Sequence, residues 1–347
     1  MKIYSYILVI MFGVMTVQCG KDELEDTLPK QDSTDDYNSY WYYSYEAVNK
    51  INALTLNMEQ ADEFIPYTVA HIGDTLLVAN IGGKGNSLML FSQKDNKLLS
   101  TIKSWQFDNK TLSFGSWIEA IVPAGDRLYI SERQSRIHVF RLPDLDYITC
   151  IGNGNWNGPV FQAQALTVND GLILARDKNG KVSIYKESDA TKDNYQKTKR
   201  YKHVSGNGSS NNSFAAHYMQ PDEDGRILLS DYENKIIRVI DPSLINDDLP
   251  DNTSIDIDEH TMALDFKPKT FAICNNRWYV TGNNDAINIY DRNLQEWCRA
   301  LKAIKGYAFS QPTRIYAQND SVLWVSDTHS SKRTLVKMVV HKGEIRD

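Results

Sequence analysis

Short apolar strands separated by polar turns recur along most of the chain. The clearest copy is FSQPTRIYAQNDSVLWVSD (309–327), followed by a further strand, TLVKMVV. Apolar and polar residues alternate in these segments, and the turns are rich in Asp, Asn and Gly, as antiparallel hairpins require. No segment with a helical period is long enough to compete. The pattern therefore predicts a chain built of β-strands.

The same order of strands occurs six times. Equivalent apolar positions in the second strands are Leu77, Tyr129, Ile173, Leu228, Tyr279 and Trp324, at spacings of 52, 44, 55, 51 and 45 residues. A fourth, looser strand follows in most copies, for example LLSTI (98–102) and YITCI (147–151). Four antiparallel strands in each repeat of roughly 45–50 residues are the pattern of a propeller. We predict an all-β fold: a six-bladed β-propeller of four-stranded antiparallel blades.

The expected blades lie near residues 59–103, 115–151, 160–204, 213–258, 266–303 and 309–345. The last blade lacks a fourth strand, because the chain ends soon after Val340. The segment KINALTLNM (50–58) precedes the first blade and has no other partner. We predict that it completes the last blade. Closure by this N-terminal strand would make residues 47–347 a single domain.

The start of the chain has a different character. Residues 1–18 combine Lys2 with an apolar run from Ile7 to Val17, which fits a secretory signal peptide. Residues 20–38 then hold seven acids and two lysines, which is typical of a solvated segment. We expect residues 19–46 to be an acidic flexible tether ending in an aromatic segment, NSYWYYSYEAV (38–48). That segment either docks against the propeller or forms an exposed interaction patch.

The end of the leader resembles that of a bacterial lipoprotein, because Cys19 directly follows the apolar run. The resemblance implies that Cys19 is acylated and begins the mature protein. Gln18 departs from the family pattern, which has a small residue there. The following GKDE resembles the signal that sends Bacteroidota lipoproteins to the cell surface. Together they imply an outer-membrane protein, held by a lipid anchor and facing the exterior.

The segment Pro312 to Asp327 also resembles an NHL repeat, with its order of Pro, apolar strand, turn and Val-x-Asp. Pro66 and Pro268 share the Pro, and Asp177 and Asp231 share the Asp. The resemblance implies a six-bladed NHL-like propeller. We expect the Asp at the end of each second strand to cap a turn.

Propellers place the start of each first strand around the central opening. Aligning the copies gives a candidate ring: Tyr67, Glu119, Gln164, His217, Lys269 and Arg314. Lys269 and Arg314 favour an anionic ligand. The alternative is a water-filled channel lined by soluble residues.

Loops before the first strands are the second candidate site. They carry the aromatic residues Trp105, Trp156 and Tyr307 among amides and hydroxyls. Flat aromatic faces beside amide groups suit sugars, although the same rings also suit packing between blades.

Composition limits the possible functions. The net charge of −6 leaves no basic footprint for nucleic acid. The sequence has no His-x-x-x-His pair, no Gly-x-Ser-x-Gly motif and no phosphate-binding loop. Cys150, Cys274 and Cys298 fit no zinc pattern and are expected to be small buried thiols.

We therefore expect a surface-tethered, monomeric propeller that binds a glycan or a partner protein on its upper face, without a cofactor. A first alternative is a metal-dependent hydrolase or lyase, since gluconolactonase-type propellers resemble this one and use a Glu that Glu119 could match. A second alternative is a non-catalytic scaffold. Enzyme activity is the less favoured reading of this sequence and stays open.

Overall fold

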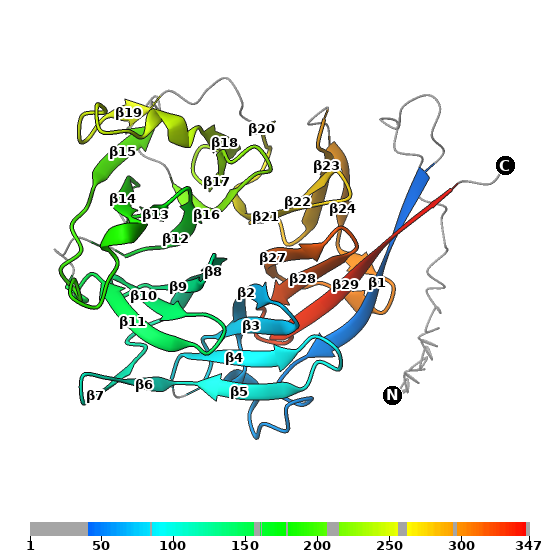
Figure 1. Ribbon diagram of the computed structural model, residues 1–347. Helices are drawn as coiled ribbons and strands as arrows, with labels where there is room; N and C mark the ends of the chain where they lie inside the picture. Colours follow the sequence, from blue (N-terminus) through cyan, green and yellow to red (C-terminus); the bar gives the residue numbers. More distant parts are fainter. Residues whose placement is uncertain are drawn as a thin grey trace, which may run out of the picture.

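Six sheets lie around one axis (Figure 1). The first four strands of each sheet pair antiparallel and follow one another from the centre to the outside of the ring. The computed structural model describes residues 41–83, 85–155, 160, 162–177, 180–206, 215–255, 262–293 and 297–344. The predicted leader, Cys19, most of the tether and Trp156 lie outside these residues. The six-bladed β-propeller predicted from the repeat is confirmed.

Each blade begins at the centre of the ring. The innermost strands are β2 (Pro66–Ile72), β8 (Ile118–Ala124), β12 (Ala165–Asn169), β16 (Ala216–Pro221), β21 (Pro268–Cys274) and β27 (Pro312–Asn319). The second strands are β3 (Thr75–Asn80), β9 (Arg127–Glu132), β13 (Leu172–Arg176), β17 (Ile227–Asp231), β22 (Arg277–Gly282) and β28 (Val322–Asp327). We call the face where the innermost strands begin and the second strands end the upper face.

The outer half of each blade completes the sheet. The third strands are β4 (Ser87–Ser92), β10 (Arg136–Arg141), β14 (Val182–Lys186), β18 (Ile236–Ile240), β23 (Ile287–Asp291) and β29 (Thr334–Glu344). The fourth strands are β5 (Leu98–Ile102), β11 (Asp146–Ile151), β15 (Lys202–Gly206), β20 (Met262–Ala263), β24 (Trp297–Leu301) and β1 (Trp41–Ile51). The predicted strands at 98–102 and 147–151 are therefore present.

Short elements connect the blades. Two small hairpins lie outside the ring sheets: β6 (Ser104–Phe107) with β7 (Lys110–Ser113), and β25 (Ala303–Ile304) with β26 (Tyr307–Ala308). The helical turns are η1 (Ala61–Glu63), η2 (Glu187–Asp189) and η3 (Pro242–Leu244). Among the described residues, no helix is long and apolar enough to span a membrane.

The hydrophobic core is divided among the interfaces between blades. Each of six buried clusters joins two neighbouring blades. Strand β28 shows how: Leu323 and Val325 face blade 5, while Trp324 between them faces blade 1. Because alternate side chains of one strand point to opposite faces, both faces of each blade are buried. This explains why the second strands are almost continuously apolar.

The strand that closes the ring lies earlier in the chain than predicted. Residues Trp41–Ile51 form β1 and pair antiparallel with β29 over its whole length, whereas the prediction placed this strand at 50–58. Tyr43 and Tyr45 are buried between blades 5 and 6. The aromatic segment thus supplies the closing strand itself, and the ring begins before residue 47.

The predicted strand at 50–58 is mostly a turn. Asn52 and Thr55 exchange side-chain and main-chain hydrogen bonds, which bend the chain after Ile51. Leu54 is 83% exposed. Asx and hydroxyl turns of this kind compete with strand pairing, and here they end β1.

The boundary between blades 3 and 4 also differs from the prediction. Strand β19 (Ser254–Ile255), expected in the fourth blade at 213–258, pairs parallel with β15 of blade 3. The fourth strand of blade 4 is β20, beyond residue 258. The loop after β18 buries Ile245 between blades 3 and 4. Because this loop packs against the core, the fourth strand of blade 4 begins later in the sequence than predicted.

A buried acid or amide at the end of the second strand holds the incoming loop on the upper face. In blade 6 the carboxylate of Asp327 accepts hydrogen bonds from the main-chain N–H of Ser310 and Gln311, both at 2.8 Å. Groups that accept in the same way in other blades are Asn80, Glu132 and Asp231. The predicted capping role of this position is confirmed.

The chain enters the ring from the face opposite to these caps. Thr334 pairs with Asp327 on the upper face, so β29 runs away from it, and Trp41 pairs with Glu344 at the far end. Strand β1 therefore begins at the lower face. In Figure 1 the ends of β1 and β29 extend side by side beyond the ring.

Candidate functional site

Arg314 ties the centre of the ring together from β27 of blade 6. Its guanidinium donates to the carbonyl oxygen of His217 in blade 4 and to the hydroxyl of Tyr67 in blade 1, both at 2.8 Å. It also lies 3.7 Å from the carboxylate of Glu119 in blade 2. Arg314 is 7% exposed. The centre of the propeller is therefore bridged by a buried guanidinium that links blades 1, 2, 4 and 6.

The environment of Arg314 favours its charge. Burial alone would lower the pKa of Arg314, but Tyr67 and Glu119 outweigh this and raise it. The ring of Tyr67 also lies under the guanidinium, 4.5 Å from its centre. Burial raises the pKa of Tyr67, with Arg314 opposing, so the phenol keeps its proton at neutral pH.

Glu119 is held by a second arginine that the sequence did not single out. Arg133, which follows β9, places its Nε and Nη2 atoms 2.6 Å from one carboxylate oxygen of Glu119. Glu119 is 3% exposed, while the side chain of Arg133 is 41% exposed. Glu119 thus lies between Arg133 and Arg314, and Arg133 extends the charged network toward solvent.

His217 lies among positive charges. Burial lowers its pKa to about 3, and Arg314, Arg176, Lys269 and Arg133 all contribute in the same direction. The imidazole is therefore neutral at physiological pH. Four cationic side chains from blades 2, 3, 5 and 6 thus lower the pKa of one residue of blade 4, and Arg314 among them contacts it directly.

Lys269 and Arg176 complete this group. Burial lowers the pKa of Lys269, and Arg314 adds to the effect while Asp285 opposes it. Burial likewise lowers the pKa of Arg176, with Asp177, Asp231 and Glu119 opposing. Both side chains are half-buried, and Lys269 lies in the innermost strand of blade 5 near the upper face.

Asp177, Asp231 and Glu119 lie close enough to raise the pKa of Arg176, and each of them also has another partner. Asp231 is hydrogen-bonded to Arg238 at 2.7 Å, and Asp177 lies 3.0 Å from His203. Glu119 is shared by two guanidiniums. We call the group Arg133, Arg176, Lys269, Arg314, His217, Tyr67 and Glu119 the cationic mouth.

Two aromatic side chains border the cationic mouth. Trp117, just before β8, is 44% exposed, and Arg133 lies 4.4 Å from the centre of its ring. Tyr232, just after β17, stacks on His217 at 4.5 Å between ring centres. Flat faces therefore lie beside the charges on the upper face.

The structure brings most of the predicted ring together. Tyr67, Glu119, His217 and Arg314 are joined by the contacts above, and Lys269 is close enough to change the pKa of His217. Gln164 is half-buried, and its main-chain N–H donates to the carbonyl of Arg176 at 3.2 Å. All six predicted positions thus belong to the cationic mouth or border it.

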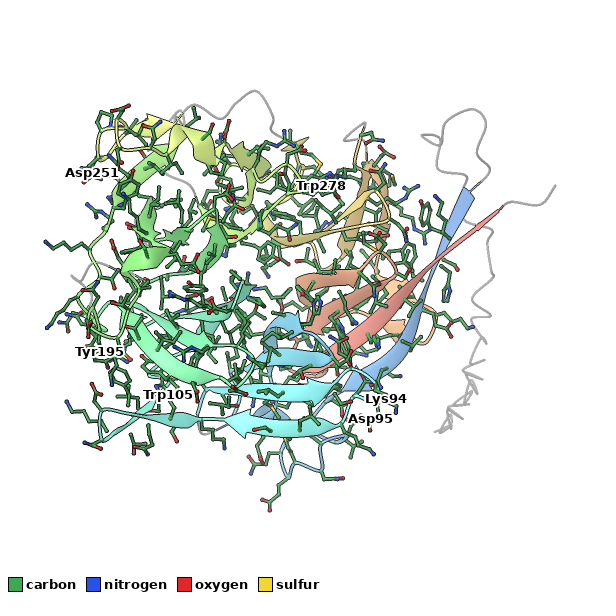
Figure 2. All side chains as sticks on the ribbon, in the orientation of Figure 1. Lys94, Asp95, Trp105, Tyr195, Asp251 and Trp278 are labelled. Carbon is green, nitrogen blue, oxygen red and sulfur yellow. The ribbon has the colours of Figure 1, made fainter. Side chains whose placement is uncertain are left out.

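Two of the predicted loop aromatics, Trp105 and Tyr307, make contacts within the fold. Trp105 packs against Phe114, His138, Phe140 and Tyr147 in a cluster between blades 1 and 2. Figure 2 shows it at the outside of the ring, away from the innermost strands. Such packing leaves little of its ring for a sugar.

Tyr307 is likewise engaged within the fold. Its hydroxyl donates to Asp327 at 3.1 Å, and its ring packs edge-to-face on Phe309. It supports the loop cap of blade 6. Trp156 lies outside the described residues.

The residues of the mouth do not fit a bound divalent metal, which the gluconolactonase-like alternative would need. Glu119 already faces two guanidiniums, and His217 lies among four cations that would repel a metal ion. Within the described ranges, no three His, Cys, Asp or Glu side chains gather as a ligand set. Cys150 and Cys274 are buried and Cys298 is half-buried, and none of the three forms a disulfide within the described residues.

Sequence reasoning missed Arg133, Arg176, Trp117 and Tyr232 as site residues. Three of them lie next to the capping position at the end of a second strand, a position that was read as structural. The sequence pattern could have indicated these residues. The second strands end on the same face where the first strands begin, so residues beside the cap lie on the face that carries the predicted ring. Trp117 directly precedes a first strand and is found by the same rule.

Comparison with known proteins supports the fold alone. No family model and no curated protein matches the sequence. A β-propeller domain of Cps50 (Swd1) from Myceliophteria thermophila is similar with a TM-score of 0.56 and 12% identity, over 86% of this chain and all of that domain. A protein of unknown function from Bacteroides thetaiotaomicron is similar with a TM-score of 0.56 and 12% identity, over 87% of this chain and 76% of that one. At this identity the likeness shows that the chain has a β-propeller fold.

Proposed function

We propose that this protein is a binding protein whose propeller captures an anionic ligand in the cationic mouth. The observation that carries the proposal is the network in which Arg133 and Arg314 both contact Glu119 and Arg314 also reaches His217 and Tyr67. Arg176 and Lys269 add positive charge that lowers the pKa of His217. Charges held in a partly dehydrated site attract an opposite charge more strongly than surface charges do.

Lys269 supports the proposal most specifically. Its lowered pKa means that burial and neighbouring cations make its charge costly. A bound carboxylate, sulfate or phosphate group would relieve that cost through charge-assisted hydrogen bonds. The ligand belongs to a glycan or a partner protein that carries such groups.

The proposal includes a lipid anchor at Cys19, with the propeller outside the cell and NHL-like in its repeats. Strand β1 begins at the lower face, so the proposed tether would join the propeller on the face opposite to the cationic mouth. The repeated cap at the second strand end supports the NHL resemblance. Replacing the anchor residue, Cys19→Ser, is expected to release soluble protein, and protein that stays membrane-bound would remove this part of the proposal.

Calorimetric titration with charged and neutral oligomers tests the binding function. The wild type is expected to bind anionic oligomers and not neutral ones, and Lys269→Gln is expected to weaken binding about tenfold. The matched control is Lys94→Gln, which removes the same charge from an exposed turn at the outside of blade 1 (Figure 2). Equal binding by both variants, or no anion binding at all, would leave the scaffold alternative.

A further inference from the structure

We infer that the ligand of the cationic mouth is an acidic glycan, with a uronate carboxylate among the cations and a sugar ring stacked on Trp117. The inference rests on the proposed function, because it names the ligand class of the same site. Four features of the upper face carry it: the cations, the neutral hydrogen-bonding groups, the exposed ring of Trp117, and its fixed orientation.

Trp117 is held in place without being covered. Its carbonyl oxygen accepts a hydrogen bond from the main-chain N–H of Arg133 at 2.9 Å, and the guanidinium of Arg133 lies 4.4 Å from its ring centre. Arg133 is fixed in turn by Glu119 at 2.6 Å. Yet 44% of Trp117 remains exposed. A single exposed aromatic residue is ordinary on a protein surface, but this one is oriented by the charged network of the mouth.

The mouth also offers neutral hydrogen-bonding groups beside the cations. The imidazole of His217 is neutral, because burial and the surrounding cations lower its pKa to about 3. The phenol of Tyr67 accepts from Arg314 and keeps its own proton to donate. Gln164 is the neighbour of Arg176 on the innermost side of blade 3, because its main-chain N–H donates to the Arg176 carbonyl. Such groups can hydrogen-bond to the hydroxyls of a sugar, whereas cations alone do not distinguish a sugar from another anion.

These features match the chemistry of a uronate sugar. A uronate carries a carboxylate for the guanidinium fork, hydroxyls for neutral donors and acceptors, and an apolar C–H face for an aromatic ring. An acidic peptide has carboxylates without the stacking face and hydroxyls. A nucleic acid brings a dense row of phosphates toward a protein whose net charge is −6. The acidic glycan is the class that uses all the groups present.

The test is calorimetric titration with four probes: a galacturonate hexamer, its carboxyl-reduced neutral form, a hexaglutamate peptide and a thymidine hexanucleotide. We expect the galacturonate hexamer to bind best and the reduced form to bind at least tenfold more weakly. Trp117→Ala is expected to weaken galacturonate binding roughly three- to tenfold, the size of one aromatic stacking contact. Trp117→Phe should recover part of the loss.

The matched control is Trp297→Ala, because Trp297 is 60% exposed on the outer strand β24 and far along its blade from the mouth. It should bind like the wild type. Melting curves confirm that each variant is folded. Galacturonate binding that Trp117→Ala leaves unchanged would overturn the inference.

The failures of the two proposals are distinguishable. Hexaglutamate or the hexanucleotide binding more tightly than galacturonate, with a loss in Lys269→Gln, would keep the anion site and overturn the glycan. Absence of binding by every anionic probe would overturn both.

Discussion

Arg314 of blade 6 and His217 of blade 4 are joined by a 2.8 Å hydrogen bond between the guanidinium and the main-chain carbonyl, although blade 5 separates their strands. The same guanidinium reaches Tyr67 of blade 1 and Glu119 of blade 2. One side chain therefore connects four blades at the axis. It holds Tyr67, Glu119 and the main chain of His217 in one network.

The first prediction concerns the stability that Arg314 provides. Replacing it by methionine keeps much of its volume but removes a buried partner of Glu119 and Tyr67. Breaking such a buried charged contact should reduce the free energy of unfolding by roughly 3 kcal/mol, measured by urea denaturation. The control Arg141→Met, at an exposed position of β10, should change it by less than about 0.5 kcal/mol. Equal effects of the two variants would contradict the bridging role.

The second prediction concerns pH. The folded-state pKa of His217 is lowered to about 3 from an ordinary value of 6.5. Between these values the unfolded chain binds the proton and the folded protein does not, so this contribution to stability is complete above about pH 6.5 and falls as the pH drops toward about 3. Thermal unfolding followed across this range should show the slope. His217→Gln should reduce it, and His329→Gln, at an exposed position, should not.

Ligand affinity should change with pH in the opposite direction. A bound anion raises the pKa of His217 from about 3, so binding takes up a proton once the pH approaches that raised value, as long as the ligand stays ionised. Affinity for the galacturonate hexamer should therefore rise as the pH is lowered from 7 toward 4 in the wild type and stay nearly flat in His217→Gln. A flat profile in the wild type would place the ligand away from His217.

The third prediction tests which segment closes the ring. Tyr45 in β1 is 6% exposed and packs edge-to-face on Tyr279 at 6.1 Å between ring centres. Tyr45→Ala should cost about 3–5 kcal/mol of unfolding free energy, as for other buried aromatic truncations. Leu54→Ala, in the segment first expected to be the strand, should cost almost nothing. The reverse order would favour a closing strand at 50–58.

The fourth prediction concerns the loop caps. Asp327 is fully buried and accepts from two main-chain N–H groups. Asp327→Ala leaves both donors without a partner, which should cost about 2–4 kcal/mol. Hydrogen exchange at Ser310 and Gln311 should become faster at the same time. Asp320→Ala, in an exposed turn of the same blade, should leave both quantities unchanged.

The repeat predicted the ring because each blade uses the same order of strand, turn and strand, and the period of the pattern counts the blades. The same symmetry placed Tyr67, Glu119, His217, Lys269 and Arg314 near one another, since the first strands all begin around the axis. The proximity of these residues could therefore be predicted without knowledge of side-chain packing.

Other features depend on contacts that a linear pattern does not contain. Tyr43 and Tyr45 alternate as a strand requires, but their burial is set by blade 5, far along the sequence. Trp105 was predicted to be a loop residue. In the structure it lies in the hairpin β6–β7 and packs against Tyr147 in the outer strand of blade 2. Arg133 was not predicted as a site residue, because it follows a position that was interpreted as a structural cap. Local propensity gives the element, while tertiary packing decides which face of it is used.

The most direct test of an anion site in the mouth follows the lysine side chains by NMR after reductive ¹³C-methylation. The Lys269 signal is assigned by its absence in Lys269→Arg, and its pKa is measured with and without the galacturonate hexamer. We predict that the free protein shows a lowered pKa for Lys269, that the ligand shifts this signal and raises the pKa, and that Lys94 does not respond. A ligand that binds while the Lys269 signal stays unchanged would contradict the cationic mouth as the binding site.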